Sequence, residues 1–289
     1  MVRMTPLAPT RDEGGAGAAS ASAARPRSEP LGTRQEHLRS LSIAWQLARL
    51  DLVRRYTATM LGLAWAVASP LLMAAVIGLV FARLFGVPIA EFLPYLFLNL
   101  TLWSFFVACL DSGAIAFIAA EGYIKQIPRV AFFTYPLRMV FAAFVTLALG
   151  LVAAAIVSFV FGNRPSVYWI GILPALGVWF LFGFAIACIS GVLNTAVRDF
   201  QYIQSVGVQA LFYATPVMFP ADLLVEHGLQ WMLTYNPLYH LMMLVCVPLL
   251  INEPATLPHW IAAAITLAAV SAFAIFAMRV ARPRLVYWL

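Results

Sequence analysis

Residues 139–163 read MVFAAFVTLALGLVAAAIVSFVFGN and contain no charged side chain. A helix needs about 20 apolar residues to cross the hydrocarbon core of a bilayer, and it satisfies its own backbone polar groups where water is absent. This stretch therefore predicts a membrane-spanning helix. Uncharged runs of similar length lie at residues 57–82, 92–110, 165–197, 200–221 and 254–278. Together they predict an all-α integral membrane protein with six transmembrane helices per protomer.

The composition excludes a water-soluble globular protein. Hydrophobic residues make up 63% of the chain and charged residues 10%, with a mean hydropathy of +0.89. That much apolar surface cannot be buried in one soluble core, so lipid is expected to be its solvent. The net charge of +6 comes from Lys and Arg at the ends of apolar runs rather than from a basic patch on one face. We therefore expect no nucleic-acid partner.

The positions of the basic residues predict the orientation of the chain. Six spans place every Lys and Arg on one side of the membrane except Arg83 and Arg164. Because basic residues concentrate in cytoplasmic loops, both termini are predicted to be cytoplasmic in this multi-pass protein. Residues 221–253 have no Lys or Arg and are predicted to lie on the other side. The apolar part of this region, residues 241–251, is too short to span, so it predicts short re-entrant helices between spans five and six.

The N-terminal part of the chain divides into two segments. Residues 1–34 are rich in Gly, Ala, Ser, Pro and Arg and predict a disordered tail, and residues 35–289 form the transmembrane domain. Within it, residues 35–56 predict an amphipathic interfacial helix. Its apolar stripe consists of Leu38, Leu41, Trp45, Ala48 and Leu52, of which Trp45 is a candidate interfacial residue. Further candidates, Arg54, Arg55 and Tyr56, lie at the end that leads into the first span. A soluble helix packed against a partner domain is the alternative.

The sequence offers little chemistry for energising transport on its own. Asp111 is the one ionisable residue near the interior of an apolar run, and it is either a helix-interior or dimer-interface carboxylate or a group on an ion or substrate path. The chain has a single lysine, Lys125, followed by Gln126, which excludes a phosphate-binding G-x-x-x-x-G-K-[ST] loop. If ATP drives this protein, a separate subunit must therefore bind and hydrolyse it.

Two cytoplasmic connections are candidates for docking such a subunit. Lys125 and Arg129 lie in the connection of residues 121–135, and Arg198 and Asp199 lie between spans four and five. Basic residues at these places also serve membrane orientation alone, so both interpretations stay open.

Aromatic side chains are the candidate substrate contacts. A sugar ring stacks on such side chains, although most aromatics in membrane helices pack or form the interfacial belt. The candidates for a channel are Trp65, Phe81, Tyr95, Trp103, Phe105, Phe212 and Tyr213, and those for a gate are Trp231, Tyr235 and Pro237. The four histidines are scattered over different segments, so neither a catalytic site nor a metal site is predicted.

Several motifs resemble one transporter family. Residues 55–65 match the pattern R-Y-x-x-T-x-L-G-x-x-W and are followed by Pro-Leu-Leu at residues 70–72. This stretch resembles the entrance to span one in the membrane subunits of ATP-binding-cassette (ABC) exporters of O-antigen, capsule and teichoic-acid polysaccharides. Further agreement lies at residues 122–126, at Asn194 with Arg198 and Asp199, at residues 215–220 and at residues 236–238, so the resemblance covers residues 36–289. Thr59, Thr215 and the pair Ile127-Pro128 depart from the usual residues.

The resemblance implies a set of partners. The chain would be the permease of a bacterial cytoplasmic (inner) membrane transporter and would form a homodimer with one channel for a lipid-linked glycan. Two copies of an ABC ATPase subunit would use ATP and Mg, whereas this chain would bind no cofactor and would not be an enzyme. Closure of the ATPases would push on the two connections and move spans one and five apart. An ABC exporter of a drug or lipid, and an ion-coupled carrier or a membrane enzyme acting on lipid-linked sugar, are the alternatives.

Overall fold

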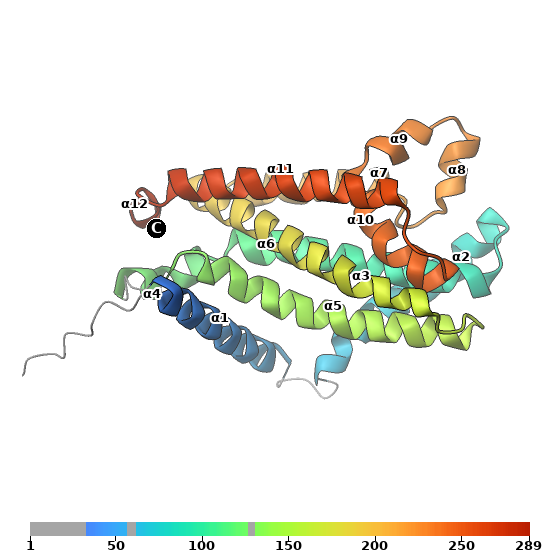
Figure 1. The fold of residues 1–289 in the computed structure, drawn as a ribbon, viewed down its shortest axis with the longest axis horizontal. Helices are drawn as coiled ribbons and strands as arrows, with labels where there is room; N and C mark the ends of the chain where they lie inside the picture. Colours follow the sequence, from blue (N-terminus) through green and yellow to red (C-terminus); the bar gives the residue numbers. More distant parts are fainter. Residues whose placement is uncertain (1–32, 57–61, 127–130) are drawn as a thin grey trace, which may run out of the picture.

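The computed structural model describes residues 33–56, 62–126 and 131–289, and within these ranges the chain is helical without a strand. Five helices of this described part are long and apolar enough to cross a membrane. They are α2 (Trp65–Phe85), α3 (Ile89–Ala114), α5 (Thr134–Val160), α6 (Ile172–Ala196), which a 3₁₀ turn η3 (Val167–Gly171) precedes, and α11 (Leu257–Ala281). They run side by side as a bundle (Figure 1). The all-helical, multi-pass membrane architecture is confirmed.

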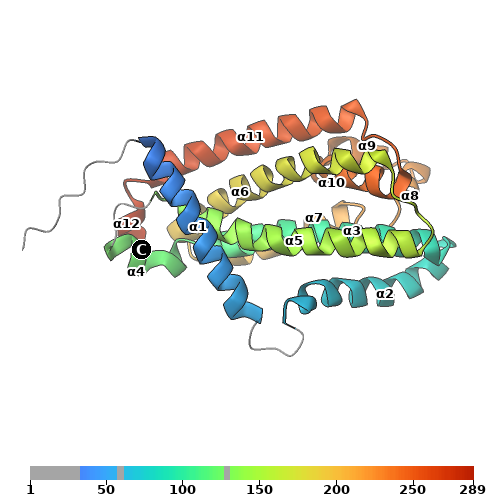
Figure 2. The same cartoon turned by 60° about the horizontal axis from the view of Figure 1, so that its bottom comes forward.

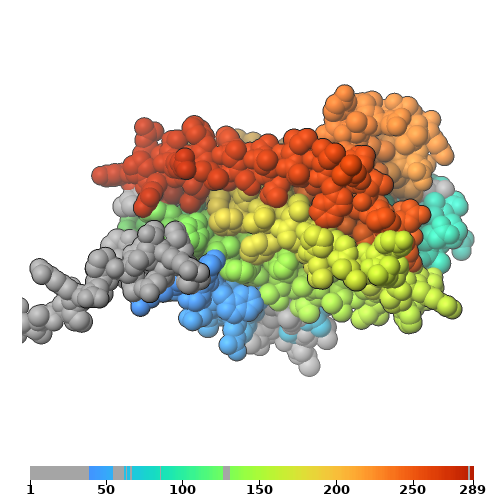
Figure 3. Space-filling view, in the orientation of Figure 1, coloured from blue at the N-terminus to red at the C-terminus, as the bar shows by residue number. Residues whose placement is uncertain are grey.

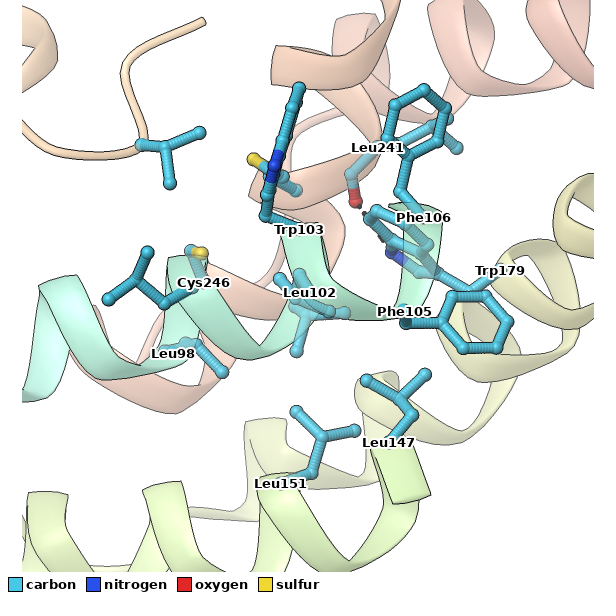
Figure 4. Close-up of a cluster of buried hydrophobic side chains, with 14 of the residues drawn as sticks. Leu98, Leu102, Trp103, Phe105, Phe106, Leu147, Leu151, Trp179, Leu241 and Cys246 are labelled. Atoms are coloured by element: carbon cyan, nitrogen blue, oxygen red, sulfur yellow. Dashed lines mark hydrogen bonds between the residues drawn. The ribbon is translucent and has the colours of Figure 1, made fainter. Parts of the chain in front are cut away.

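Helix α3 is the centre of the bundle. Its main neighbours are α2, α5 and α6, and two thirds of its length is buried, whereas most of α2 and α11 is exposed. Figure 4 shows the core around it, with Leu102 and Phe105 of α3 between Leu147 of α5 and Trp179 of α6. The indole N–H of Trp179 donates to the carbonyl oxygen of Leu241 at 3.1 Å. Because these helices are apolar on all sides, the burial of each one depends on how many other helices it packs against.

Helices α3 and α6 cross at glycines. A Cβ atom at Gly113 would lie 2.6 Å from Cα of Ala187, and one at Gly191 would lie 2.8 Å from the carbonyl oxygen of Gly113. Small residues let the backbones of membrane helices approach closely, and van der Waals packing then holds them together. Beside the crossing, Asn194 of α6 donates to the carbonyl oxygen of Ala114 at 2.9 Å. Helices α3 and α6 are therefore one rigid unit at this level.

The predicted fifth span is shorter than its apolar run. Helix α7 (Phe200–Ala214) ends seven residues before residue 221, because Thr215 precedes a proline, Pro216, and takes an extended conformation. Fifteen residues of helix span about 22 Å, less than the roughly 30 Å of a typical hydrocarbon core. Helix α7 is therefore not among the five helices that are long enough to cross on their own.

The segment between α7 and α11 consists of short helices. They are α8 (Ala221–Glu226), α9 (Gln230–Tyr235) and α10 (Pro237–Cys246), and α10 continues as a π-helix, η4 (Val247–Ile251). The buried α10 packs against α6 and α11, whereas α8 and α9 protrude from the molecule (Figure 3). Pro248 lies inside the helical stretch, where the wider π-turn removes its clash with the preceding turn.

Helix α1 (Thr33–Tyr56) crosses the bundle obliquely at one end (Figure 2). It packs mainly on α5, and the side chains it buries there are the small Ser40, Ala44 and Ala48. Of the predicted apolar stripe, Ala48 is buried on α5, whereas Leu41 and Trp45 remain about half exposed, so α5 covers only part of the stripe. Small residues define the packing face because they allow the two helices to approach closely.

Short elements gather at the same end as α1. The 3₁₀ turn η2 (Ile118–Ala120) leads into α4 (Glu121–Gln126), and α12 (Leu285–Trp288) follows α11. We call this end of the bundle the α4 end and the opposite one the α8–α9 end (Figure 1). The predicted tail falls on residues 1–34, of which residues 1–32 lie outside the described ranges. The three cysteines, Cys109, Cys188 and Cys246, are buried and unpaired, as expected of small hydrophobic residues.

Candidate functional site

The two predicted docking connections lie near one another at the α4 end. Lys125 Nζ donates to Glu121 Oε1 at 2.6 Å, and both side chains are more than two fifths exposed. The hydrogen bond and the charge of Lys125 lower the pKa of the Glu121 carboxyl, and the charge of Arg198 lowers it further. The turn between α6 and α7, with Arg198 and Asp199 exposed, therefore lies within electrostatic reach of α4. Arg129, the fourth predicted docking residue, lies outside the described residues.

A small apolar cluster stabilises this end from inside. It joins Phe117 and Ile124 around α4, Val192 of α6, and Ala281 and Leu285 beside α12. Because buried side chains in contact transmit displacement, a force on α4 acts on α6 and on the end of α11 together. We call Tyr123, Lys125, Arg198 and Asp199, all of them exposed, the α4 surface.

Three of the predicted channel aromatics are mostly buried within this chain. Trp103 and Phe105 lie in the core, with ring centroids 5.2 Å from Phe212 and 6.0 Å from Trp179 respectively. The hydroxyl of Tyr95 lies 2.6 Å from the carbonyl oxygen of Pro216. This hydrogen bond satisfies the irregular backbone that follows α7, which at membrane depth requires partners from the protein or from water.

The other channel candidates lie nearer the surface. Trp65 and Tyr213 are exposed, by 42% and 64%, whereas Phe81 and Phe212 are half-buried. Tyr213 belongs to a set of exposed residues spaced by four, three and four positions along one face of α7. This set, the α7 stripe, consists of Tyr202, Val206, Gln209 and Tyr213. A tyrosine- and glutamine-bearing stripe on a membrane helix is typical of a surface that faces protein or water rather than lipid.

Two of the three predicted gate residues lie on the protruding helix α9, and the third begins the buried helix α10. Trp231 and Tyr235 of α9 are 60% and 80% exposed, and Pro237 begins α10. Asn236 accepts from the backbone N–H of Leu238 and donates to Thr215 Oγ1 at 2.9 Å, so it caps α10 and joins it to the end of α7. The aromatic rings of α9 therefore stand outside a firmly anchored α10.

Asparagine and histidine side chains fix α10 and η4 further. At the far end, Asn163 donates to the carbonyl oxygen of Leu249 at 2.8 Å. Nearer to α9, His240 and His259 share a hydrogen bond of 2.8 Å between their Nδ1 atoms, and His240 Nε2 donates to the carbonyl oxygen of Thr234 at 3.0 Å. These contacts connect α9, α10 and α11.

The residues named for the interfacial helix lie around the contact of α1 with α5. The ring of Trp45 meets Phe141 edge to face at a centroid distance of 5.7 Å, and Arg54 is exposed. The side chains of Arg55 and Tyr56 are not among those described. Sequence reasoning missed the ion pair of this contact, in which Arg138 Nε lies 2.5 Å from Asp51 Oδ2.

Sequence reasoning also missed the polar contacts between spans. Asp111 Oδ1 accepts from Gln204 Nε2 of α7 at 3.1 Å. The signal available in the sequence was the presence of Gln204 and Ser190 in otherwise apolar runs, because polar side chains within membrane helices need partners. In the described part of the chain, no three His, Cys, Asp or Glu side chains come together in a way that could hold a metal ion.

Comparison with known proteins identifies the family. The profile of the family described as ABC-2 type transporter matches residues 44–250. Two O-antigen export system permease proteins RfbA from Klebsiella pneumoniae are 31% and 30% identical to this chain over 191 residues, which are 65% of this chain and 72% of each relative. The protein of the same name from Myxococcus xanthus is 25% identical over 197 residues, 68% of this chain and 75% of the relative. The chain belongs to the ABC-2 type transporter family.

Proposed function

We propose that this chain is the channel-forming subunit of an ABC transporter that exports a lipid-linked polysaccharide of the O-antigen, capsule or teichoic-acid class across the bacterial cytoplasmic membrane. The observation that carries the proposal is the 31% identity to an O-antigen export permease over most of both chains. Separate ATPase subunits supply the energy with ATP and Mg, because the chain lacks a phosphate-binding loop.

The orientation follows from the positive charge. The α4 end is cytoplasmic, with both termini on that side, because all Lys and Arg except Arg83 and Arg164 belong to it in a six-span topology. In this topology α7 is the fifth of six crossing elements, and α8 to α10 form the gate region on the outer side. The α4 surface then faces the cytoplasm, where the ATPase subunits are.

Two copies of the chain form the transport path. Helix α7 and much of α2 are exposed in one copy, including Val76 and Leu84 of α2 at 64% and 70%. An exposed stripe with Gln209 and Tyr213 is costly against lipid, so it faces the partner copy or the path between them. Rings that give many weak contacts suit a polymer that must slide, since conduction requires binding weak enough to allow exit.

Reversing the charge of the α4 surface tests the ATPase docking. We expect Lys125→Glu combined with Arg198→Glu to reduce copurification of the ATPase subunit at least tenfold, because two favourable charge contacts become repulsive. The measurement is the amount of ATPase retained on the tagged permease in detergent. Arg164→Glu, which changes an exposed arginine at the α8–α9 end, is the matched control. Equal retention in both variants would contradict the docking assignment.

The α7 stripe provides a second test. We expect Tyr213→Ala to lower glycan export about threefold to tenfold while Tyr213→Phe keeps it, because one ring contact contributes about 0.5–1.5 kcal/mol. The measurement is the rate at which glycan enters the lumen of inverted vesicles at equal permease level. Phe276→Ala, at a ring of α11 that is 63% exposed, is the control. Export that is unchanged in Tyr213→Ala would show that the α7 stripe does not contact the glycan.

A further inference from the structure

Helix α7 is held to the rest of the chain by few side chains. Its main neighbours are α3 and α6, and Gln204 is its one buried residue, at 7% exposure. Ile203 and Val206, on either side, are 66% and 70% exposed. Apart from the partly buried Val208 and Phe212, which pack on the core, the position of α7 in the bundle therefore depends on what Gln204 contacts.

Gln204 connects three helices by hydrogen bonds. Its Nε2 donates to Asp111 Oδ1 of α3 at 3.1 Å, and its Oε1 accepts from the hydroxyl of Ser190 of α6. Both the donor and the acceptor of the amide are used, and one of its partners is a carboxylate. A hydrogen bond to a charged group shifts a two-state equilibrium by on the order of tenfold or more, so these contacts decide where α7 sits.

The partners of Gln204 can release it at low cost. Ser190 has one hydroxyl hydrogen and a second acceptor, the carbonyl oxygen of Leu110, at 2.9 Å. When α7 withdraws, Ser190 donates to Leu110 and keeps a partner. Asp111 is exposed, so water can replace Gln204 at its carboxylate. The contact therefore has two satisfied states on the α3–α6 side, which is what a conformational switch requires.

The contact also lies between the two connections of the α4 surface. Gln204 lies six and five residues after the exposed Arg198 and Asp199, in the second turn of α7, and Asp111 is in the last turn of α3, ahead of α4. The α3–α6 unit is fixed at the same level by its glycine crossing and by Asn194. If the turn at Arg198 is displaced relative to α4, α7 therefore moves relative to the α3–α6 unit.

We propose that Asp111, Gln204 and Ser190 form a releasable latch that holds α7 in the closed arrangement, and that Gln204 is a positioning residue whose release accompanies opening. The inference rests on the proposed function as an ATP-driven exporter. It assigns Asp111 to helix positioning rather than to an ion path.

The test compares four variants of the complete complex with its ATPase in proteoliposomes. Gln204→Leu keeps a side chain of similar size but removes both hydrogen bonds. Gln204→Glu places a carboxylate against Asp111. The double variant Asp111→Asn with Gln204→Glu exchanges donor and acceptor and restores both hydrogen bonds. Gln201→Leu, at an exposed position of the same helix, is the control.

Two readouts separate positioning from mere stability. We expect Gln204→Leu and Gln204→Glu to increase backbone hydrogen exchange of residues 200–214 about tenfold, and to lower the glycan exported per ATP hydrolysed about tenfold. The double variant returns both values to those of the wild type, and Gln201→Leu leaves them unchanged. We expect every variant to have the melting temperature of the wild-type permease.

Several results would overturn the latch. They are wild-type hydrogen exchange of α7 in Gln204→Leu, the same defect in the double variant as in Gln204→Glu, or a lowered melting temperature that accounts for the lost export. Hydrogen exchange needs no glycan, so it tests the latch separately. A wild-type complex that hydrolyses ATP and moves no glycan would instead overturn the proposed function.

Discussion

Replacing Gly191 with leucine is expected to destabilise the permease strongly by forcing two packed helices apart. A Cβ atom at this position would lie 2.8 Å from the carbonyl oxygen of Gly113 and 3.0 Å from the ring of Phe117. The first of these neighbours is backbone and cannot turn aside, so α3 and α6 must separate. We expect the free energy of unfolding to fall by about 3 kcal/mol and the melting temperature by about 6–12 °C.

Gly177 of the same helix provides the control for this prediction. A Cβ atom there meets nothing within 4 Å. Leucine also favours helix over glycine by up to about 1 kcal/mol, so Gly177→Leu is expected to melt at or above the wild-type temperature. Thermal unfolding of the two purified variants in the same detergent is the measurement. Equal melting temperatures would show that the α3–α6 crossing can open without cost.

Removing Arg138 is expected to release α1 from the bundle. The guanidinium lies 2.5 Å and 3.1 Å from the two carboxylate oxygens of Asp51, and the side chains are 14% and 29% exposed. Arg138→Ala leaves a largely covered carboxylate without its partner, which costs about 1–3 kcal/mol for a pair that retains some contact with water. Because α1 otherwise buries small side chains on α5, this loss is large relative to the whole contact.

Limited trypsin digestion measures this release, because α1 carries arginines that become cleavable when the helix separates. We expect cleavage after Arg39 and Arg49 to accelerate about fivefold to a hundredfold in Arg138→Ala. The exchanged pair, Asp51→Arg with Arg138→Asp, should restore the slow rate. Arg54→Ala, which removes an exposed arginine of the same helix, should leave cleavage at the other two sites unchanged. A slow rate in Arg138→Ala would mean that the ion pair does not hold α1.

The long helices were predictable from the sequence because lipid leaves few alternatives to an uncharged run of about 20 residues or more. Five such runs correspond to α2, α3, α5, α6 and α11, with ends shifted by a few residues. Hydropathy failed at the end of α7, because Thr215 and Pro216 are compatible with an apolar run but not with a continued helix. It also did not show that residues 237–251 form one buried helical stretch, which depends on a π-turn at Pro248.

The contacts between distant residues were not predictable. Asp51 and Arg138 are 87 positions apart, and Asp111 and Gln204 are 93 positions apart. One sequence contains no signal that pairs them, because each could find many polar partners until the helices are placed. The packing of α1 on α5 was not predicted, because the stripe of this helix was assigned to the membrane interface, whereas Ser40, Ala44 and Ala48 permit close approach to α5. The roles of the channel, gate and docking residues stay predictions.

The burial of Cys109, Cys188 and Cys246 has a consequence for spectroscopy. A thiol shielded from water reacts slowly with maleimides and methanethiosulfonates, because reaction requires the accessible thiolate. A fluorophore or nitroxide can therefore be attached to one cysteine introduced at an exposed site such as Trp231, without first deleting the native ones. Cys109 in particular should be kept, since its sulfur fills the space beside Gly183. In the proposed homodimer, distances between the two copies then become measurable in an otherwise native chain.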